Sequence, residues 1–241
     1  MDEQGSILGV WREALAIIRR YPSAVMVPAA GLGALAEAPA YLIEDRALLD
    51  QVLTYVTAAL AYYLYLAYAE GLTTDYERGR DLIAAGGTLG ELRQAVPFVP
   101  RVLAAALVTL SIASAATGLL MVPGAWLFTR WSLSTPAICK EGLGALEALR
   151  RSNELVRGRF WFVLGTATLA FFLEEVVIHA GALAAGSLSG SHTWGEWIGG
   201  SIVAALAIPL AALATSLAYS RVVQHAEPVE GVQGARHYTN L

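Results

Sequence analysis

Long apolar runs constrain the fold of this chain more than any other feature. A helix needs about 20 mostly apolar residues to cross the hydrocarbon of a membrane. Six runs approach or exceed that length, and they cover residues 23–43, 49–72, 102–122, 124–139, 160–186 and 197–219. Lipid offers no hydrogen-bond partner to a backbone amide, so each run is expected to be helical. The sequence therefore predicts an all-α fold, a polytopic bundle of six transmembrane helices.

The composition agrees with a chain that faces lipid. Hydrophobic residues make up 56% and charged residues 15%, whereas about a quarter of the residues of soluble domains are charged. The net charge of −4 is small and gives no reason to expect a nucleic-acid partner. Cys139 is the only cysteine, which excludes an intrachain disulfide and a thiolate metal cluster. We expect membrane lipids as partners, and a protein partner is compatible with the same composition.

The positions of the basic residues predict the topology. With a cytoplasmic N-terminus, all Lys and Arg except Arg46 and Arg130 fall in the inner segments. Positive residues resist translocation and stay cytoplasmic. We therefore expect a multi-pass protein of the cell (cytoplasmic) membrane with both termini in the cytoplasm. Residues 1–224 are expected to form a single integral membrane domain, and residues 225–241 a polar tail.

Three charged segments on the inner side are expected to be amphipathic helices, over residues 6–20, 88–95 and 142–157. In the third, Leu146, Leu149, Asn153 and Val156 share one helical face. This helix either lies in the membrane interface or packs on the inner ends of the bundle as a structural elbow. In the first alternative, anionic headgroups would contact the arginines of this region, which are Arg150, Arg151, Arg157 and Arg159.

Five polar residues fall inside the expected spans, where a charge is costly and usually has a partner. They are Glu37, Arg130, Glu174, Glu175 and His179. We expect Arg130 to pair with Glu174 or Glu37, and Glu175 to share a helical face with His179. The cluster is a structural ion pair, a polar pocket for a lipid headgroup or small solute, or a proton relay or metal site. Zinc needs three or four ligands and Glu175 with His179 supplies two, so we expect no metal and no cofactor.

Two further patterns admit more than one interpretation. A tyrosine stripe along the second span consists of Tyr55, Tyr62, Tyr65 and Tyr68. It either lines a cavity or packs against other helices, because a buried hydroxyl needs a partner in both cases. A ridge of alanines at helical spacing in the sixth span, from Ala207 to Ala218, is expected to let another helix approach closely.

One region resembles a known family. Residues 121–165 read MVPGAWLFTRWSLSTPAICKEGLGALEALRRSNELVRGRFWFVLG. This pattern resembles the membrane domain fused to some bacterial glycerophosphodiester phosphodiesterases, and the related YciC-like six-span membrane proteins. The specific part covers about residues 119–165. In the fused proteins, a separate soluble barrel carries the catalytic residues. No stretch of this chain matches that barrel, so the resemblance implies the membrane half without the phosphodiesterase activity.

Two functional hypotheses remain. The first is a non-enzymatic module that organises the membrane or binds a protein partner, with a link to glycerophospholipid metabolism through the resemblance. The alternative is a transporter or lipid-handling protein with an intramembrane polar pocket. The chain contains no Walker loop, dinucleotide fingerprint, Gly-x-Ser-x-Gly or His-Glu-x-x-His motif, and we expect no catalytic residues.

Overall fold

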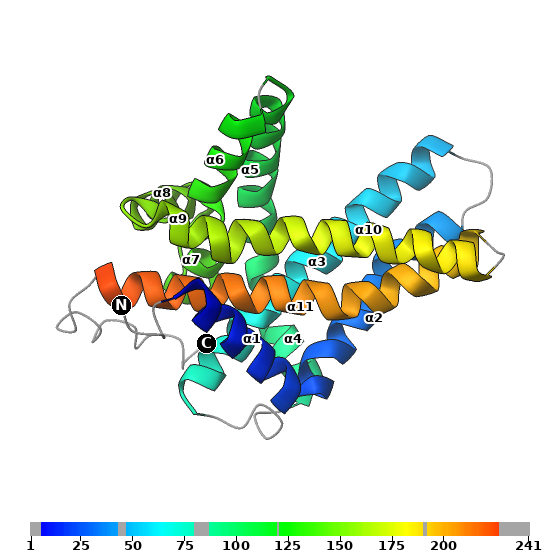
Figure 1. Ribbon diagram of the computed structural model, residues 1–241, viewed down its shortest axis with the longest axis horizontal. Coiled ribbons are helices and arrows are strands. Elements are labelled where there is room, and N and C mark those ends of the chain that lie inside the picture. Colours follow the sequence, from blue (N-terminus) through cyan, green and yellow to red (C-terminus); the bar gives the residue numbers. More distant parts are fainter. Residues whose placement is uncertain (1–5, 43–46, 80–86, 120, 190–191, 227–241) are drawn as a thin grey trace.

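The computed structural model of the chain is all-helical over the residues that it describes, which are 6–42, 47–79, 87–119, 121–189 and 192–226 (Figure 1). The α-helices are α1 (Ile7–Arg20), α2 (Pro22–Leu42), α3 (Ala47–Glu77), α4 (Gly87–Ala95), α5 (Val99–Leu119), α6 (Met121–Trp131), α7 (Ser134–Glu141), α8 (Ala145–Val156), α9 (Phe160–Val163), α10 (Leu169–Ser189) and α11 (His192–Ala226). A short 3₁₀ turn, η2 (Val96–Phe98), joins α4 to α5, and a π-helical segment, η3 (Leu164–Thr168), joins α9 to α10.

Within the described residues, three helical stretches are long and apolar enough to cross a membrane. They are Gly90–Thr109, Phe160–Ser187 and Ser201–Ala226, and Pro22–Leu35 is a shorter apolar helix. The second and third of these stretches overlap the runs expected at residues 160–186 and 197–219. The all-helical class and the presence of membrane-compatible helices therefore agree with the expectation from sequence.

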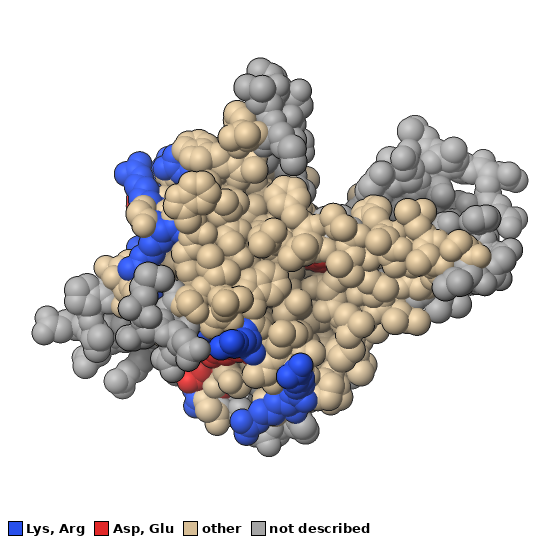
Figure 2. Space-filling view, viewed as in Figure 1, with Lys and Arg blue, Asp and Glu red and all other residues tan. Residues whose placement is uncertain are grey.

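The long helices α10 and α11 run antiparallel through the molecule, with α2 and α3 packed on α11 (Figure 1). The α5–α6 hairpin points away from this group (Figure 1). The helix α11 contacts α1, α7 and α8, and α3 contacts α7. Ion pairs from Arg221 to Glu13 and from Lys140 to Glu77 bring the C-terminal turns of α11 and α3 to the same end of the molecule. Lys and Arg side chains gather around α1 and α8 in Figure 2, while most of the remaining visible surface carries no charge. We call the region where these five helices meet the basic end.

Close packing between α10 and α11 depends on glycine. A Cβ atom built on Gly199 would lie 2.1 Å from the Cβ of Ala185, and one built on Gly181 would lie 2.5 Å from Val203 Cγ2. Neither position has room for a side chain. Small residues let membrane helices approach closely and gain dispersion energy over a long contact, so these glycines bring α10 and α11 together.

The apolar run at residues 124–139 was expected to form one span. The expectation that it is one continuous helix is wrong. The run is divided between α6 and α7, which are separated at Ser132 and Leu133. At 1.5 Å per residue, α6 is roughly 16 Å long and cannot cross a bilayer alone. A side chain of α8 bonds to both sides of this break: Ser152 Oγ accepts from Leu133 N at 3.2 Å and donates to Arg130 O at 2.8 Å. One backbone donor and one backbone acceptor at the break are therefore satisfied.

The helix α8 packs on the bundle, as the elbow alternative requires. Its buried residues are Ala148, Leu149, Ser152, Leu155 and Val156. Leu146, which was expected on the apolar face, is 63% exposed, because the buried stripe passes through Ala148 and Ser152 instead. Helices α1 and α4 occupy the other two segments that were expected on the inner side.

The entry helix α1 is fixed to the start of α10. The π-helical segment interrupts the regular backbone pattern and places Gly165 beneath α1. Trp11 Nε1 donates to Gly165 O at 3.2 Å, and a Cβ on Gly165 would lie 2.6 Å from Ile7 Cδ1. At the other end of the chain, α11 includes residues 225 and 226 of the expected polar tail, and the rest of that tail lies outside the described residues.

Candidate functional site

A cavity of about 90 Å³ lies inside the bundle, where α3, α5, α6, α7, α10 and α11 surround it. We call it the membrane cavity. Its wall combines aromatic rings, small apolar side chains, hydroxyls and one carboxylate. The residues used below are Tyr62, Ala106, Phe128, Phe171, Glu70 and Thr215.

Aromatic side chains form much of the apolar wall. The ring centroids of Phe128 on α6 and Phe171 on α10 are 4.9 Å apart, which closes the wall between these helices. Tyr62 of α3 adds a polar group, since its hydroxyl donates to Glu174 Oε2 at 3.3 Å. Glu174 is only 3% exposed. A buried carboxylate therefore lies directly behind one wall of the cavity.

The carboxylate of Glu70 lines the cavity from α3. Glu70 is 4% exposed, and its Oε2 accepts from Ser216 Oγ of α11 at 2.6 Å. The hydroxyls of Ser216 and Thr73 are also hydrogen-bonded to each other. Burying a carboxylate is costly unless hydrogen bonds or a cation compensate for the lost water. The hydrogen bond from Ser216 supplies part of that compensation, and it fixes the rotation of α3 relative to α11.

The compensating cation is Lys140 of α7. Its Nζ lies 3.8 Å from Glu70 Oε2 and 3.7 Å from Glu77 Oε2, and it donates to Ser220 Oγ at 2.7 Å. Glu70 belongs to the wall of the membrane cavity, whereas Glu77 and Ser220 line a second pocket at the basic end. Lys140 therefore links the polar part of the cavity to the basic end.

A second charged group joins α7, α8 and α11 close by. Arg151 Nε of α8 donates to Glu141 Oε1 at 3.1 Å, and the hydroxyl of Tyr219 also donates to Glu141 Oε1. Arg151 and Glu141 are about one-quarter exposed, so water screens their attraction in part. This group holds α8 against the end of the bundle. Arg151 therefore contacts protein, whereas it was expected near lipid headgroups.

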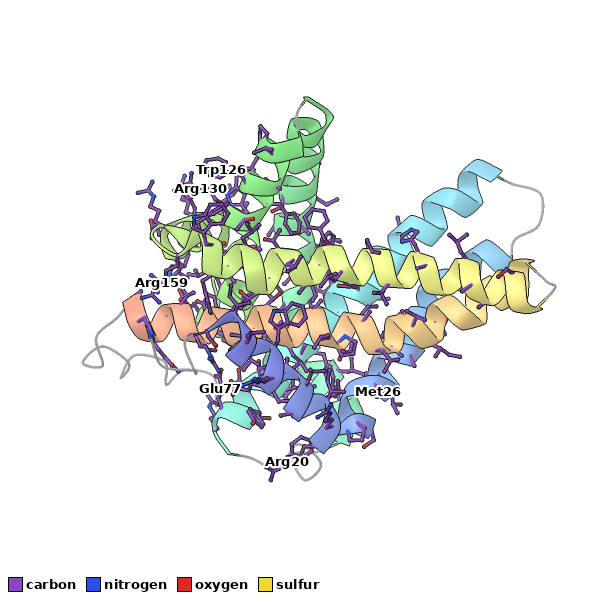
Figure 3. The ribbon with its side chains drawn as sticks, viewed as in Figure 1. Arg20, Met26, Glu77, Trp126, Arg130 and Arg159 are labelled. Carbon is purple, nitrogen blue, oxygen red and sulfur yellow. The ribbon has the colours of Figure 1, made fainter. Side chains whose placement is uncertain are left out.

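Arg130 does not make the expected ion pair within the described residues. Its guanidinium carbon lies 4.5 Å from the ring centre of Trp126, one turn earlier on α6 (Figure 3). The residue of α6 that faces the η3–α10 helix is instead Thr129, whose Oγ1 accepts from Thr168 Oγ1 at 3.0 Å. Adjacent helical residues point about 100° apart. Arg130 is therefore turned away from Glu174.

The other residues of the expected intramembrane cluster are only partly visible. The side chains of Glu37 and Glu175 lie outside the described residues, and His179 is exposed on α10. The pairing of Glu175 with His179 stays a prediction. The described part of the chain contains no group of three or more His, Cys, Asp or Glu residues arranged to hold a metal ion.

The remaining arginines of the expected headgroup set lie at the surface. Arg150 and Arg157 are exposed, and Arg159 is partly exposed. Figure 3 shows Arg159 at the same side of the molecule as Arg130. Trp161 follows shortly afterwards and is 77% exposed. An exposed tryptophan beside arginines is typical of a surface at a membrane interface.

Some residues of the tyrosine stripe serve helix packing, and one lines the membrane cavity. Tyr65 and Tyr68 are buried and donate to the carbonyl oxygens of Val25 and Ala24 on α2, so they serve helix packing. Tyr62 lines the membrane cavity. The side chain of Tyr55 lies outside the described residues.

Sequence reasoning missed the two charged residues closest to the cavity. Glu70 lies only two residues before the end of the expected second span, and Lys140 was treated only as a topology marker. The rule that selected Glu37, a carboxylate within an apolar run, also applies to Glu70. The sequence holds no signal that would have paired Glu70 with Lys140, because that pairing depends on how α3 and α7 meet.

The comparisons with known proteins give no relative. The chain matches no protein-family model, no curated protein and no solved structure.

Proposed function

We propose that this chain is a multi-pass membrane protein that binds the polar group of a lipid or other amphipathic molecule in the membrane cavity, without catalysing a reaction. The observation that carries this proposal is the mixed wall of the cavity, in which aromatic rings and a buried carboxylate face the same space. Binding sites for small molecules combine mostly apolar walls with a few polar groups that fix orientation. The cavity meets that description.

The size and charge of the cavity suggest which group it accepts. A volume of about 90 Å³ suits a small polar group, while an acyl chain would remain outside among the helices. The charged residue of the wall is Glu70, an acceptor. A hydroxyl or amine could donate to it, whereas no Lys, Arg or His among the described wall residues would face an anionic group. We therefore favour a neutral polyol or an amine-bearing headgroup.

Native mass spectrometry of the protein released from gentle detergent tests the proposal. Ala106→Leu fills the cavity from α5, and Ala104→Leu adds the same volume at an exposed position of the same helix. We expect a bound lipid on the wild type and on Ala104→Leu, and its loss from Ala106→Leu. Equal lipid occupancy in all three proteins would overturn the proposal.

We further propose six spans with both termini in the cytoplasm, with α6 and α7 together forming the fourth span. The gathering of basic residues around α1 and α8 supports this orientation (Figure 2). Val122 is 79% exposed at the start of α6, and Arg157 is exposed after α8. In a Cys139→Ser background, an impermeant maleimide should label Val122→Cys on intact spheroplasts. It should label Arg157→Cys only after permeabilisation, and the reverse pattern would exclude this topology.

A membrane-organising or partner-binding role is the second candidate. The ion pairs of Lys140 and Arg151 support it, because they join α3, α7, α8 and α11 as a structural element would. In the lipid experiment, a stoichiometric protein in place of a lipid would favour this candidate. The resemblance to phosphodiesterase-linked membrane domains is the basis on which we place either role near glycerophospholipid metabolism.

A further inference from the structure

A second pocket lies at the basic end and plays no part in the proposed function. Its volume is about 540 Å³, and it lies between the first turns of α1, the end of α3 and the last turns of α11. We call it the basic-end pocket. The wall residues used below are Arg12, Glu13, Glu77, Ser220, Arg221 and Gln224. Pockets for small ligands occupy about 300 to 1,000 Å³, so this one has room for a metabolite-sized molecule.

The carboxylates of this wall already have cations beside them. Glu13 Oε2 accepts from Arg221 Nη2, and Glu77 Oε2 lies 3.7 Å from Lys140 Nζ. Lys140 also donates to Ser220. Glu13 therefore has a cation of its own, whereas Glu77 shares Lys140 with Glu70.

Arg221 has donor capacity that the protein does not use. Its Nη1 is buried and has no hydrogen-bond partner among the described residues. Buried polar groups nearly always have partners, and an unpaired guanidinium nitrogen is unfavourable. Arg221 itself belongs to the wall of the pocket. Arg12, one helical turn after Gly9 on the same wall, adds a second guanidinium group.

We propose that the basic-end pocket binds a phosphate ester, with Arg12 and Arg221 contacting the phosphate oxygens. Guanidinium groups present planar forks of donors that match phosphate oxygens. Gln224 supplies a neutral donor on the α11 wall, on the same helical face as Ser220. The pocket is much larger than a phosphate ion, so the ester substituent lies within it. The phosphate belongs either to a soluble ester or to a lipid headgroup.

The test uses the full chain in phosphatidylcholine nanodiscs, which expose both faces of the protein. Calorimetric titrations with glycerol 3-phosphate and with inorganic phosphate form the soluble arm. Nanodiscs that contain phosphatidic acid, read by native mass spectrometry, form the lipid arm. Binding in the soluble arm identifies a soluble ester, and retention of phosphatidic acid alone identifies a headgroup.

The decisive variant leaves the Arg221–Glu13 pair intact. Gln224→Glu keeps the shape of an exposed side chain and adds a negative charge to the wall. Gln94→Glu makes the same change at an exposed position of α4, outside the pocket. We expect Gln224→Glu to weaken ester binding about tenfold through charge repulsion and Gln94→Glu to leave it unchanged. Arg12→Gln should also weaken it.

Three outcomes would overturn the proposal. The first is a lack of binding in both arms. The second is an equal effect of Gln224→Glu and Gln94→Glu. The third is binding of inorganic phosphate without either ester, because the size of the pocket is the argument for an ester. Ala106→Leu changes only the wall of the membrane cavity and Gln224→Glu only that of the basic-end pocket, so failure here is distinguishable from failure of the proposed lipid-binding function.

Discussion

Ser152 Oγ of α8 accepts a hydrogen bond from Leu133 N, at the point where the backbone between α6 and α7 leaves the helical path. The same hydroxyl donates to the carbonyl of Arg130 on the other side of the break. One buried side chain thus satisfies a donor and an acceptor at the break. Without it, these two groups would be buried and unpaired, which is unfavourable.

Ser152→Ala should therefore destabilise the protein by about 1 to 3 kcal/mol, the cost of leaving buried polar groups unsatisfied. Equilibrium unfolding in mixed micelles measures the change. Ser187→Ala is the matched control, because Ser187 is exposed and its hydroxyl donates to Ala184 O within α10. An equal effect of the two substitutions would show that the bonds of Ser152 do not hold the break.

The Lys140–Glu70 pair predicts a specific pattern in a double-mutant cycle. Lys140→Met leaves Glu70 buried without its cation, and breaking a buried pair in this way costs about 3 to 5 kcal/mol. Adding Glu70→Gln should recover part of that loss, because the neutral amide no longer needs a cation. Arg93→Met removes a positive charge from an exposed position on α4 and should have little effect. Additive losses in the double variant would mean that the two residues are not coupled.

The stability of Arg130→Ala distinguishes the ion pair expected from the sequence from the cation–π contact found in the structure. An intramembrane ion pair would make this substitution strongly destabilising, whereas the cation–π contact with partly exposed Trp126 is worth about 0.5 to 1 kcal/mol. We expect the smaller value, and we expect Trp126→Leu to lower stability by a similar amount. A loss as large as that of Lys140→Met would indicate a carboxylate partner for Arg130.

The contact between α10 and α11 predicts opposite results for two glycines. Gly199→Ala brings a methyl group within 2.1 Å of the Cβ of Ala185 and should cost about 1 to 3 kcal/mol through overpacking. Gly31→Ala in α2 meets nothing within 4 Å and should be neutral or stabilising, since alanine favours helix. Thermal unfolding followed by circular dichroism compares the two. A neutral Gly199→Ala would mean that α10 and α11 are not in close contact there.

The helical class and the tendency of several helices to cross a membrane followed from the sequence alone. Both depend on local properties, since an apolar run in lipid must bond its own backbone. The expected segments at 6–20, 88–95 and 142–157 correspond to α1, α4 and α8. The helical periodicity that predicted them is also a local property of the sequence. The group that satisfies the break in the run at 124–139 was not predictable, because that hydroxyl lies on α8, outside the run.

Tertiary structure determined which residues come together in the site. Ser216 and Glu70 are 146 positions apart in sequence, and their hydrogen bond exists only because α3 and α11 meet at particular rotations. Packing between α3 and α7 likewise gave Lys140 two carboxylates. Hydropathy sets which residues enter the membrane, but a helix can rotate about its axis without changing its hydropathy. Which charges meet is therefore fixed by packing between helices and cannot be obtained from any one segment.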